Sequence, residues 1–159
     1  MKEALWTYRN NYLFEIERAS GIDKTQISDI TNNSMTIVNP YGRKTTYNFQ
    51  FIQDIKYITS IEGEPSPNCP SSNSTFTYDD QGLLTSKRDN NGNLTTYQYN
   101  ARGLETSRTE AAGTPQARTI TTDWHPTLFL PVQVSEPGRI TRYQYDAEGR
   151  KTGETVTTR

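Results

Sequence analysis

Apolar and polar residues alternate in short runs along most of this 159-residue chain. In residues 95–99 the period is two, so Thr95, Tyr97 and Tyr99 share one face and the residues between them lie on the other. Tyr and Thr at alternate positions favour extended strands. The pattern predicts an all-β chain of antiparallel hairpins that form a twisted, curved sheet with little helix.

Turn signals recur roughly every ten residues and divide the chain into predicted strands. Residues 3–19 could instead form a short helix, but residues 6–8 and 12–16 alternate around Asn10 and Asn11, which favours strands. The predicted strands are Tyr12–Glu17, Met35–Val38, Thr45–Phe51, Ile55–Ile61, Thr75–Tyr78, Leu84–Asp89, Leu94–Tyr99, Leu104–Thr109, Arg118–Trp124, Leu128–Val134, Ile140–Tyr145 and Lys151–Thr157.

One spacing of glycine, threonine and two aromatic residues occurs three times. It has the form Gly-x-x-Thr-x-Tyr-x-aromatic and begins at Gly42, Gly92 and Gly138. A spacing kept three times is typical of a repeat architecture. The aromatic pairs of the three copies are Tyr47 and Phe49, Tyr97 and Tyr99, and Tyr143 and Tyr145.

A turn follows the aromatic residues in each complete copy. Asp or Asn followed by glycine supplies the left-handed backbone that a tight reversal needs, so each copy is predicted to be a β-hairpin. A lone hairpin is marginal in water, and its aromatic face has to be covered by neighbouring hairpins or by another sheet. The turns are Tyr78-Asp79 with Gly82, Tyr99-Asn100 with Gly103, and Tyr145-Asp146 with Gly149.

The spacing of the turn glycines predicts one degenerate copy. Gly82 and Gly103 are 21 residues apart, whereas Gly103 and Gly149 are 46 apart, which is close to two repeats. The missing copy falls near Trp124-His125-Pro126. Because proline cannot donate a ladder hydrogen bond, Pro126 and Pro131 predict an edge, a bulge or a bend between residues 119 and 134.

Composition argues against a conventional globular core. Only 31% of residues are hydrophobic and the mean hydropathy is -0.86, while the chain has 24 threonines and 10 tyrosines. Tyrosine can bury its ring and keep its hydroxyl hydrogen-bonded at an edge. We expect a strand-rich part with degenerate repeats (1–64), a Pro/Ser/Asn linker loop (65–74) and regular repeats (75–159), joined in a single continuous sheet.

Charge and hydropathy disfavour several classes of partner. The net charge is -1, the pI is near 5.9 and basic residues are dispersed among acids, so no nucleic-acid footprint is expected. No apolar run approaches the roughly 18 residues of a membrane span, and a signal-peptide pattern is lacking. The single cysteine, Cys69, excludes an internal disulfide and is expected to be an incidental thiol.

Candidate catalytic chemistry is sparse. His125 is the only histidine, which excludes a His-rich metal site and leaves Cys69 with His125 as the sole Cys-His dyad. Carboxylates such as Asp79 and Asp146 recur at turns, where Asp caps its own backbone amides. We therefore expect no catalytic, cofactor or metal-binding residues. Trp124 and His125 leave one alternative open, a carbohydrate- or surface-binding module with exposed aromatic rings.

The motif Tyr-Asp-x-x-Gly-Leu/Arg, preceded by Gly-x-x-Thr-x-Tyr, resembles the YD repeats of bacterial Rhs proteins. Residues 74–159 carry the resemblance, and residues 40–47 extend it weakly. Long members of the family wind their repeats into a hollow β-shell around a polymorphic carboxy-terminal toxin, delivered by secretion machinery or at the cell surface. The resemblance implies a non-enzymatic shell segment, too short to close a shell and without the family's Asp-Pro-x-Gly junction.

The expected partners are the remaining repeats of a longer Rhs chain or a second copy that pairs through sheet edges as a homodimer. A toxin domain or a carbohydrate is a further candidate partner, and the resemblance implies a secreted or cell-surface location. If the tyrosine face is buried, Tyr97→Ala or Tyr143→Ala should cost about 3 kcal/mol or more. The expected structural residues of the repeat are Tyr78, Asp79, Gly82, Gly92, Tyr97, Tyr99, Gly103, Gly138, Tyr143, Tyr145, Asp146 and Gly149.

Overall fold

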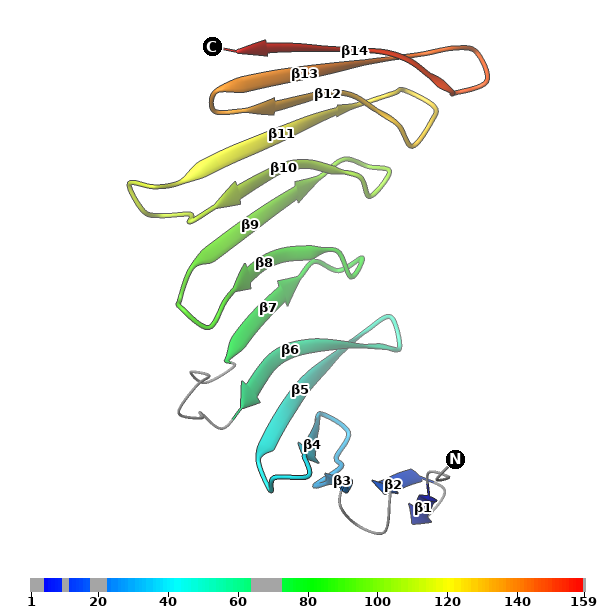
Figure 1. Ribbon diagram of the computed structural model, residues 1–159, viewed down its shortest axis with the longest axis vertical. Coiled ribbons are helices and arrows are strands. Elements are labelled where there is room, and N and C mark those ends of the chain that lie inside the picture. The colour runs from blue at the N-terminus through cyan, green and yellow to red at the C-terminus, as the bar shows by residue number, and fades with distance from the viewer. Residues whose placement is uncertain (1–4, 10–11, 18–22, 64–72, 159) are drawn as a thin grey trace. The chain divides into compact units, whose positions relative to one another are not determined.

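The computed structural model describes residues 5–9, 12–17, 23–63 and 73–158 (Figure 1). All regular structure in these residues is β-strand, with no helix, which confirms the predicted all-β class. Most of the predicted linker, including Cys69, lies outside the described residues. The strands are β1 (Leu5–Arg9), β2 (Tyr12–Glu17), β3 (Thr25–Ser28), β4 (Ser34–Val38), β5 (Lys44–Ile52), β6 (Ile55–Gly63), β7 (Ser74–Tyr78), β8 (Leu84–Arg88), β9 (Leu94–Tyr99), β10 (Glu105–Glu110), β11 (Arg118–Trp124), β12 (Pro131–Glu136), β13 (Arg139–Tyr145) and β14 (Lys151–Thr158).

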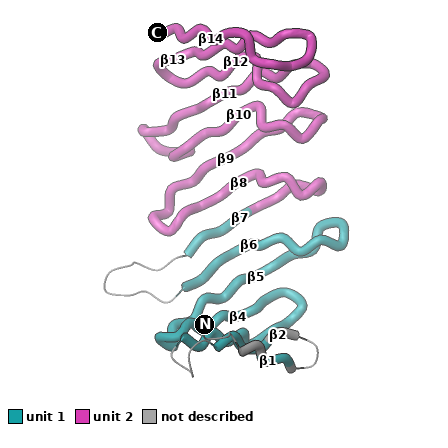
Figure 2. Tube along the Cα trace, turned by 45° about the vertical axis from the view of Figure 1, so that its right-hand side comes forward, with its two compact units in different colours: residues 1–76 teal, residues 77–159 magenta. Residues whose placement is uncertain are grey.

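The order of the strands in the sheet is the order of the chain. Neighbouring strands pair antiparallel, as short reversals between successive strands require. The chain divides into two compact units, residues 1–76 and 77–159, which are coloured separately in Figure 2.

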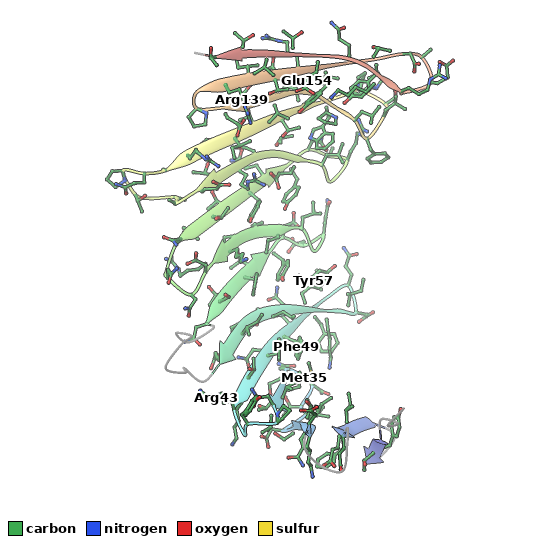
Figure 3. The ribbon with its side chains drawn as sticks, viewed as in Figure 1. Met35, Arg43, Phe49, Tyr57, Arg139 and Glu154 are labelled. Atoms are coloured by element: carbon green, nitrogen blue, oxygen red, sulfur yellow. The ribbon has the colours of Figure 1, made fainter. Side chains whose placement is uncertain are left out.

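The amino-terminal unit has one apolar and one polar face. Met35 lies opposite Tyr47, and Tyr47 lies opposite Ile61, so these three side chains share a face. Figure 3 labels Met35 among the side chains of this unit. On the other face Thr36 is buried, and its hydroxyl oxygen lies 3.1 Å from that of Thr46 on the paired strand. The hydroxyl pair satisfies a buried polar group that would otherwise weaken the sheet.

The hairpin of β5 and β6 closes through a two-residue turn. Its central residues, Gln53 and Asp54, have φ values of 50° and 63°. Positive φ at both central positions is the mark of a type I′ turn, whose twist matches that of the flanking strands. Near this turn Lys56 Nζ lies 5.6 Å from the centre of the Phe49 ring and 5.4 Å from that of Phe51.

The carboxy-terminal unit has a small core in the middle of its strands. Ile120 on β11 is 8% exposed and is the only buried hydrophobic side chain among the described residues; Thr141 on β13 is 6% exposed. Ile120 lies opposite Arg108, which in turn lies opposite Tyr97. The tyrosines of this face, Tyr97, Tyr99, Tyr143 and Tyr145, are half-buried.

One predicted strand differs from the structure, and one strand of the structure was not predicted. The strand expected at Leu128–Val134 begins only at Pro131, because the preceding turn extends to Leu130. Strand β3 was missed, since its sequence Thr-Gln-Ile-Ser has a single apolar residue and shows no alternation. The predicted irregularity near Pro131 is confirmed as a change of register between β11 and β12 at Trp124.

Candidate functional site: the repeated turn and its aromatic anchor

Five turns in the described part of the chain are closed by the same side-chain hydrogen bonds. In the turn after β7, Asp79 Oδ1 accepts from the backbone N–H groups of Gln81 and Leu83, both at 2.9 Å. The other four turns begin at Asn39, Asp89, Asn100 and Asp146, and their side-chain oxygens accept from the equivalent amides at 2.8–3.1 Å. An Asp or Asn side chain that bonds its own backbone in this way replaces ladder bonds lost at the reversal.

Glycine holds the fourth position of each of these turns. Its N–H donates to the carbonyl of the first turn residue at 2.9–3.0 Å, and its φ lies between 73° and 82°. This backbone is strained for residues with a side chain. The turn glycines are Gly42, Gly82, Gly92, Gly103 and Gly149. Gly138 belongs to the repeated spacing but is not a member of this set.

Two of the turn carboxylates are stabilised in their charged form. The Asn93 side chain, and then its backbone amide, hold the pKa of Asp89 below its usual value. The Arg150 side chain has the same effect on the pKa of Asp146, to which it donates at 2.7 Å. Both carboxylates are partly exposed and bonded within their own turns, so the shifts describe local turn bonding and not a buried reactive acid.

An aromatic donor stands immediately before three turns, two of these five and the turn that begins at His125. The Tyr99 hydroxyl donates to the backbone carbonyl of Leu84 at 2.9 Å. The Trp124 indole N–H donates to that of Glu105 at 2.8 Å, and the Tyr145 hydroxyl to that of Pro131 at 2.8 Å. Each donor therefore links its hairpin to the preceding one, and we call this bond the aromatic anchor.

The three hairpins that carry an aromatic anchor share one irregularity of register. Tyr99 lies opposite Glu105, whereas the preceding Gln98 lies opposite Ser107, so Thr106 is an extra residue. Val132 and Thr152 are the extra residues opposite Trp124 and Tyr145. Such a bulge disrupts the ladder locally and re-aims the groups beside it. In β10 and β12 the residue before the extra one supplies the acceptor carbonyl.

The degenerate turn predicted at Trp124-His125-Pro126 uses a histidine in place of the acid. His125 Nδ1 accepts from the backbone N–H of Leu128 at 3.1 Å and of Thr127 at 3.3 Å. The turn is one residue longer than the others, because the His125 N–H donates to the carbonyl of Leu130. Trp-His thus occupies the place that Tyr-Asp or Tyr-Asn has elsewhere.

Arg102 fixes this degenerate turn from the neighbouring hairpin. Its guanidinium donates to the carbonyls of His125 at 2.6 Å, Pro126 at 2.9 Å and Leu128 at 2.7 Å. The same group lies 5.0 Å from the centre of the Phe129 ring. Nothing in the sequence singled out Arg102, because its partners are 23 to 26 residues away.

Ion pairs lie among the tyrosines on the aromatic face. Arg108, opposite Tyr97, has its Nε 3.3 Å from Glu110 Oε1, an ion-pair distance without hydrogen-bond geometry. Glu110 also binds Arg118 at 2.9 Å. Burial, followed by the charge of Glu105, raises the pKa of Tyr97. Sequence reasoning predicted the aromatic stripe and missed these charges, whose pairing depends on cross-strand register.

The residues proposed for chemistry serve the backbone instead. The Trp124 indole N–H donates to the backbone carbonyl of Glu105, and the indole ring is half-buried. Neither feature favours stacking of this ring on a sugar. No group of His, Cys, Asp and Glu within the described ranges could hold a metal ion. Cys69 lies outside those ranges, so the Cys69–His125 dyad stays untested. None of the described residues forms a helix long and apolar enough to cross a membrane.

Comparison with known proteins finds one family match, over a part of the chain. Residues 78–115 match the family model for the RHS Repeat. A search of curated proteins found no match. Two similar solved structures carry the titles "Crystal Structure of TcdB2-TccC3-TEV", with a TM-score of 0.71 and 16% identity, and "Crystal Structure of TcdB2-TccC3-Cdc42", with 0.70 and 14%. Both alignments cover 97% of this chain and 9% of the other, so the shared property is the fold.

Proposed function

We propose that this chain, which carries RHS repeats, is a segment of the β-shell of an Rhs/YD-repeat protein that encloses a carboxy-terminal toxin and helps to deliver it between bacteria. The observation that carries the proposal is the aromatic anchor, which recurs at Tyr99, Trp124 and Tyr145 with one bulged register. Because the same bond joins each hairpin to the preceding one, further hairpins can be added to the sheet in the same way, as the wall of a shell requires.

The segment acts by its structure and not by catalysis. Its perturbed acids close turns, its histidine caps a turn, and the half-buried Arg108 pairs with neighbouring glutamates. These bonds hold backbone and side chains in place, whereas a catalytic group needs an acid, base or nucleophile directed at a substrate. A non-enzymatic role accounts for each of these contacts.

The partners of the segment are further repeats. It spans only 9% of the TcdB2-TccC3 chains whose fold it shares, which supports a place within a longer wall. Unpaired sheet edges invite another strand, and a second copy could supply it in solution. Light scattering over a concentration series tests this pairing. The average molar mass should rise as the protein concentration is raised. The long protein would be secreted or held at the cell surface.

The proposed enclosure can be tested by protease protection in the full-length protein that the gene of this segment encodes. A protease site and epitope are placed in the carboxy-terminal domain, and cleavage is followed during heating. If the repeats enclose that domain, cleavage begins only at the temperature at which the sheet unfolds. Ile120→Ala should lower both temperatures together, because this side chain is the buried apolar residue of its unit.

The matched control is Ile55→Ala, which makes the same truncation at a side chain that is 58% exposed. It should leave both temperatures within about 1 °C, the shift expected for a few tenths of a kcal/mol. Rapid cleavage of the carboxy-terminal site in the fully folded protein would exclude enclosure. A locus that encodes neither further repeats nor a second domain would also count against the proposal.

A further inference from the structure

The acceptors of the aromatic anchor occupy one position in their strands. The carbonyls that receive the three donors belong to Leu84, Glu105 and Pro131. These are the first residues of β8, β10 and β12, the second strands of successive hairpins. The second strand of the following hairpin is β14, and its first residue is Lys151. Lys151 therefore holds the position of an acceptor.

The hairpin of β13 and β14 reproduces the local geometry of the hairpin of β9 and β10. Tyr145 lies opposite Lys151 with Thr152 as the extra residue, as Tyr99 lies opposite Glu105 with Thr106 extra. The bulge is the feature that accompanies an anchored carbonyl in β10 and β12. Because the bulge is already present in β14, the acceptor is formed before any donor arrives.

Strand β14 is the last in the strand order and pairs with β13. Most of its residues are exposed, its eight-residue sequence contains no proline, and Gly153 lies against the Gln144 side chain on its paired side. An edge of this length is a template for another strand. Its charged residues, Lys151 and Glu154, pair with each other and so leave no net charge to repel an incoming strand.

We propose that the outer edge of β14 docks an antiparallel strand from another hairpin of the RHS class, and that a Tyr or Trp immediately before the turn of that hairpin donates to the Lys151 carbonyl. The inference rests on the proposed function and adds the register and the chemistry of the partner. All three anchors place an aromatic O–H or N–H beside an Asn, His or Asp that closes a turn. A strand without such a donor would leave the Lys151 carbonyl without its aromatic hydrogen bond.

A cyclised peptide of residues 139–158 tests the proposal against the intact chain. This sequence is a hairpin whose ends, Arg139 and Thr158, already lie opposite each other, so closing the ring preorganises it. Its Tyr145 is the donor under test, and Tyr143 provides a matched control on the same face. Isothermal calorimetry gives the affinity, and hydrogen exchange of the intact chain locates the contact.

The parent peptide should slow exchange of the β14 amides. Tyr145→Phe in the peptide should weaken binding roughly three- to tenfold, the effect of one hydrogen bond, and Tyr143→Phe less than about twofold. Equal weakening by the two variants, or none by Tyr145→Phe, would overturn the aromatic donor while leaving edge pairing and the shell proposal intact. Binding without protection of β14, or no binding by any peptide, would overturn the docking edge itself. The protease experiment on the full-length protein remains an independent test of the shell.

Discussion

The longest hairpins of the two units close through different turns, although the turn at Asn39 in the amino-terminal unit is of the kind used in the carboxy-terminal unit. In the carboxy-terminal unit, reversals at Asp79, Asp89, Asn100 and Asp146 all use a side-chain oxygen and a glycine of positive φ. In the amino-terminal unit, the longest hairpin closes through Gln53 and Asp54, two residues with side chains in left-handed backbone. The first kind of turn has a sequence signature, Asp or Asn with a glycine three residues later. The turn at Gln53 and Asp54 lacks a glycine and is marked in the sequence only as two polar residues between two strand-like segments.

The units also bury different groups. Each unit buries one threonine, Thr36 or Thr141, but among the described residues only the carboxy-terminal unit also buries a hydrophobic side chain, that of Ile120. A single sheet can protect few side chains, so one well-covered residue makes a large share of the apolar stabilisation. Stability in the carboxy-terminal unit should therefore depend on a few positions.

Ile120→Ala should produce the largest loss of stability. Removal of a buried isoleucine typically costs about 2 to 5 kcal/mol, and the open sheet places this site near the lower end. Urea unfolding followed by circular dichroism measures the change. Val156→Ala on β14 should cost less than about 0.5 kcal/mol, because that side chain is already 52% exposed. Equal effects of the two substitutions would contradict a core at Ile120.

Gly149→Ala should come next. Gly149 has a φ of 79°, and an added Cβ would lie 3.3 Å from Leu128 Cδ1, so strain of about 1 to 2 kcal/mol is expected. Gly92→Ala has the same backbone strain, with φ at 82°, but meets open space and should cost less. Gly138→Ala has neither feature and serves as control. Thermal melts of the three variants should rank in that order; a Gly138→Ala melt as low as that of Gly149→Ala would refute this account of the turn.

The turns could be predicted from sequence because each is specified within six residues. Asp or Asn followed by glycine at the fourth turn position fixes both the side-chain bond and the left-handed backbone. The degenerate copy at Trp124-His125 was also found, through the spacing between glycines. The greater length of its turn was not predicted, because a histidine that accepts hydrogen bonds at the first turn position has no general sequence signature.

Contacts across strands could not be predicted in the same way. The reach of Arg102 to the turn at His125, and the pairing of Glu110 with Arg118, depend on where single bulged residues shift the register. Those bulges follow from the packing of the whole sheet. The expected cost of about 3 kcal/mol for Tyr97→Ala assumed a covered ring, and the half-buried ring predicts a smaller loss.

Tyr99→Phe should have a smaller effect than the glycine changes. It removes the bond to the Leu84 carbonyl and keeps the ring, so a loss of about 1 kcal/mol is expected. Tyr97→Phe is the matched control on the same strand and face, because no hydrogen bond of its hydroxyl occurs within the described residues. Chemical denaturation of both variants should separate them. A Tyr97→Phe loss as large as that of Tyr99→Phe would remove the special role given to the anchor.

Alkaline pH should give the smallest effect, and it tests whether the hydroxyls of Tyr97 and Tyr99 in the carboxy-terminal unit stabilise the fold in their protonated form. Burial, followed by the charge of Glu105, raises the pKa of both Tyr97 and Tyr99. A group whose folded pKa is raised contributes stability that is complete below its unfolded pKa of about 10 and is lost as pH rises through the folded pKa. Ionisation of Tyr99 also removes the donor to Leu84. Denaturation midpoints should therefore be level up to about pH 10 and then fall, whereas the double variant Tyr97→Phe/Tyr99→Phe should fall less steeply over the same range. An equal fall in the double variant would assign the alkaline loss to other groups.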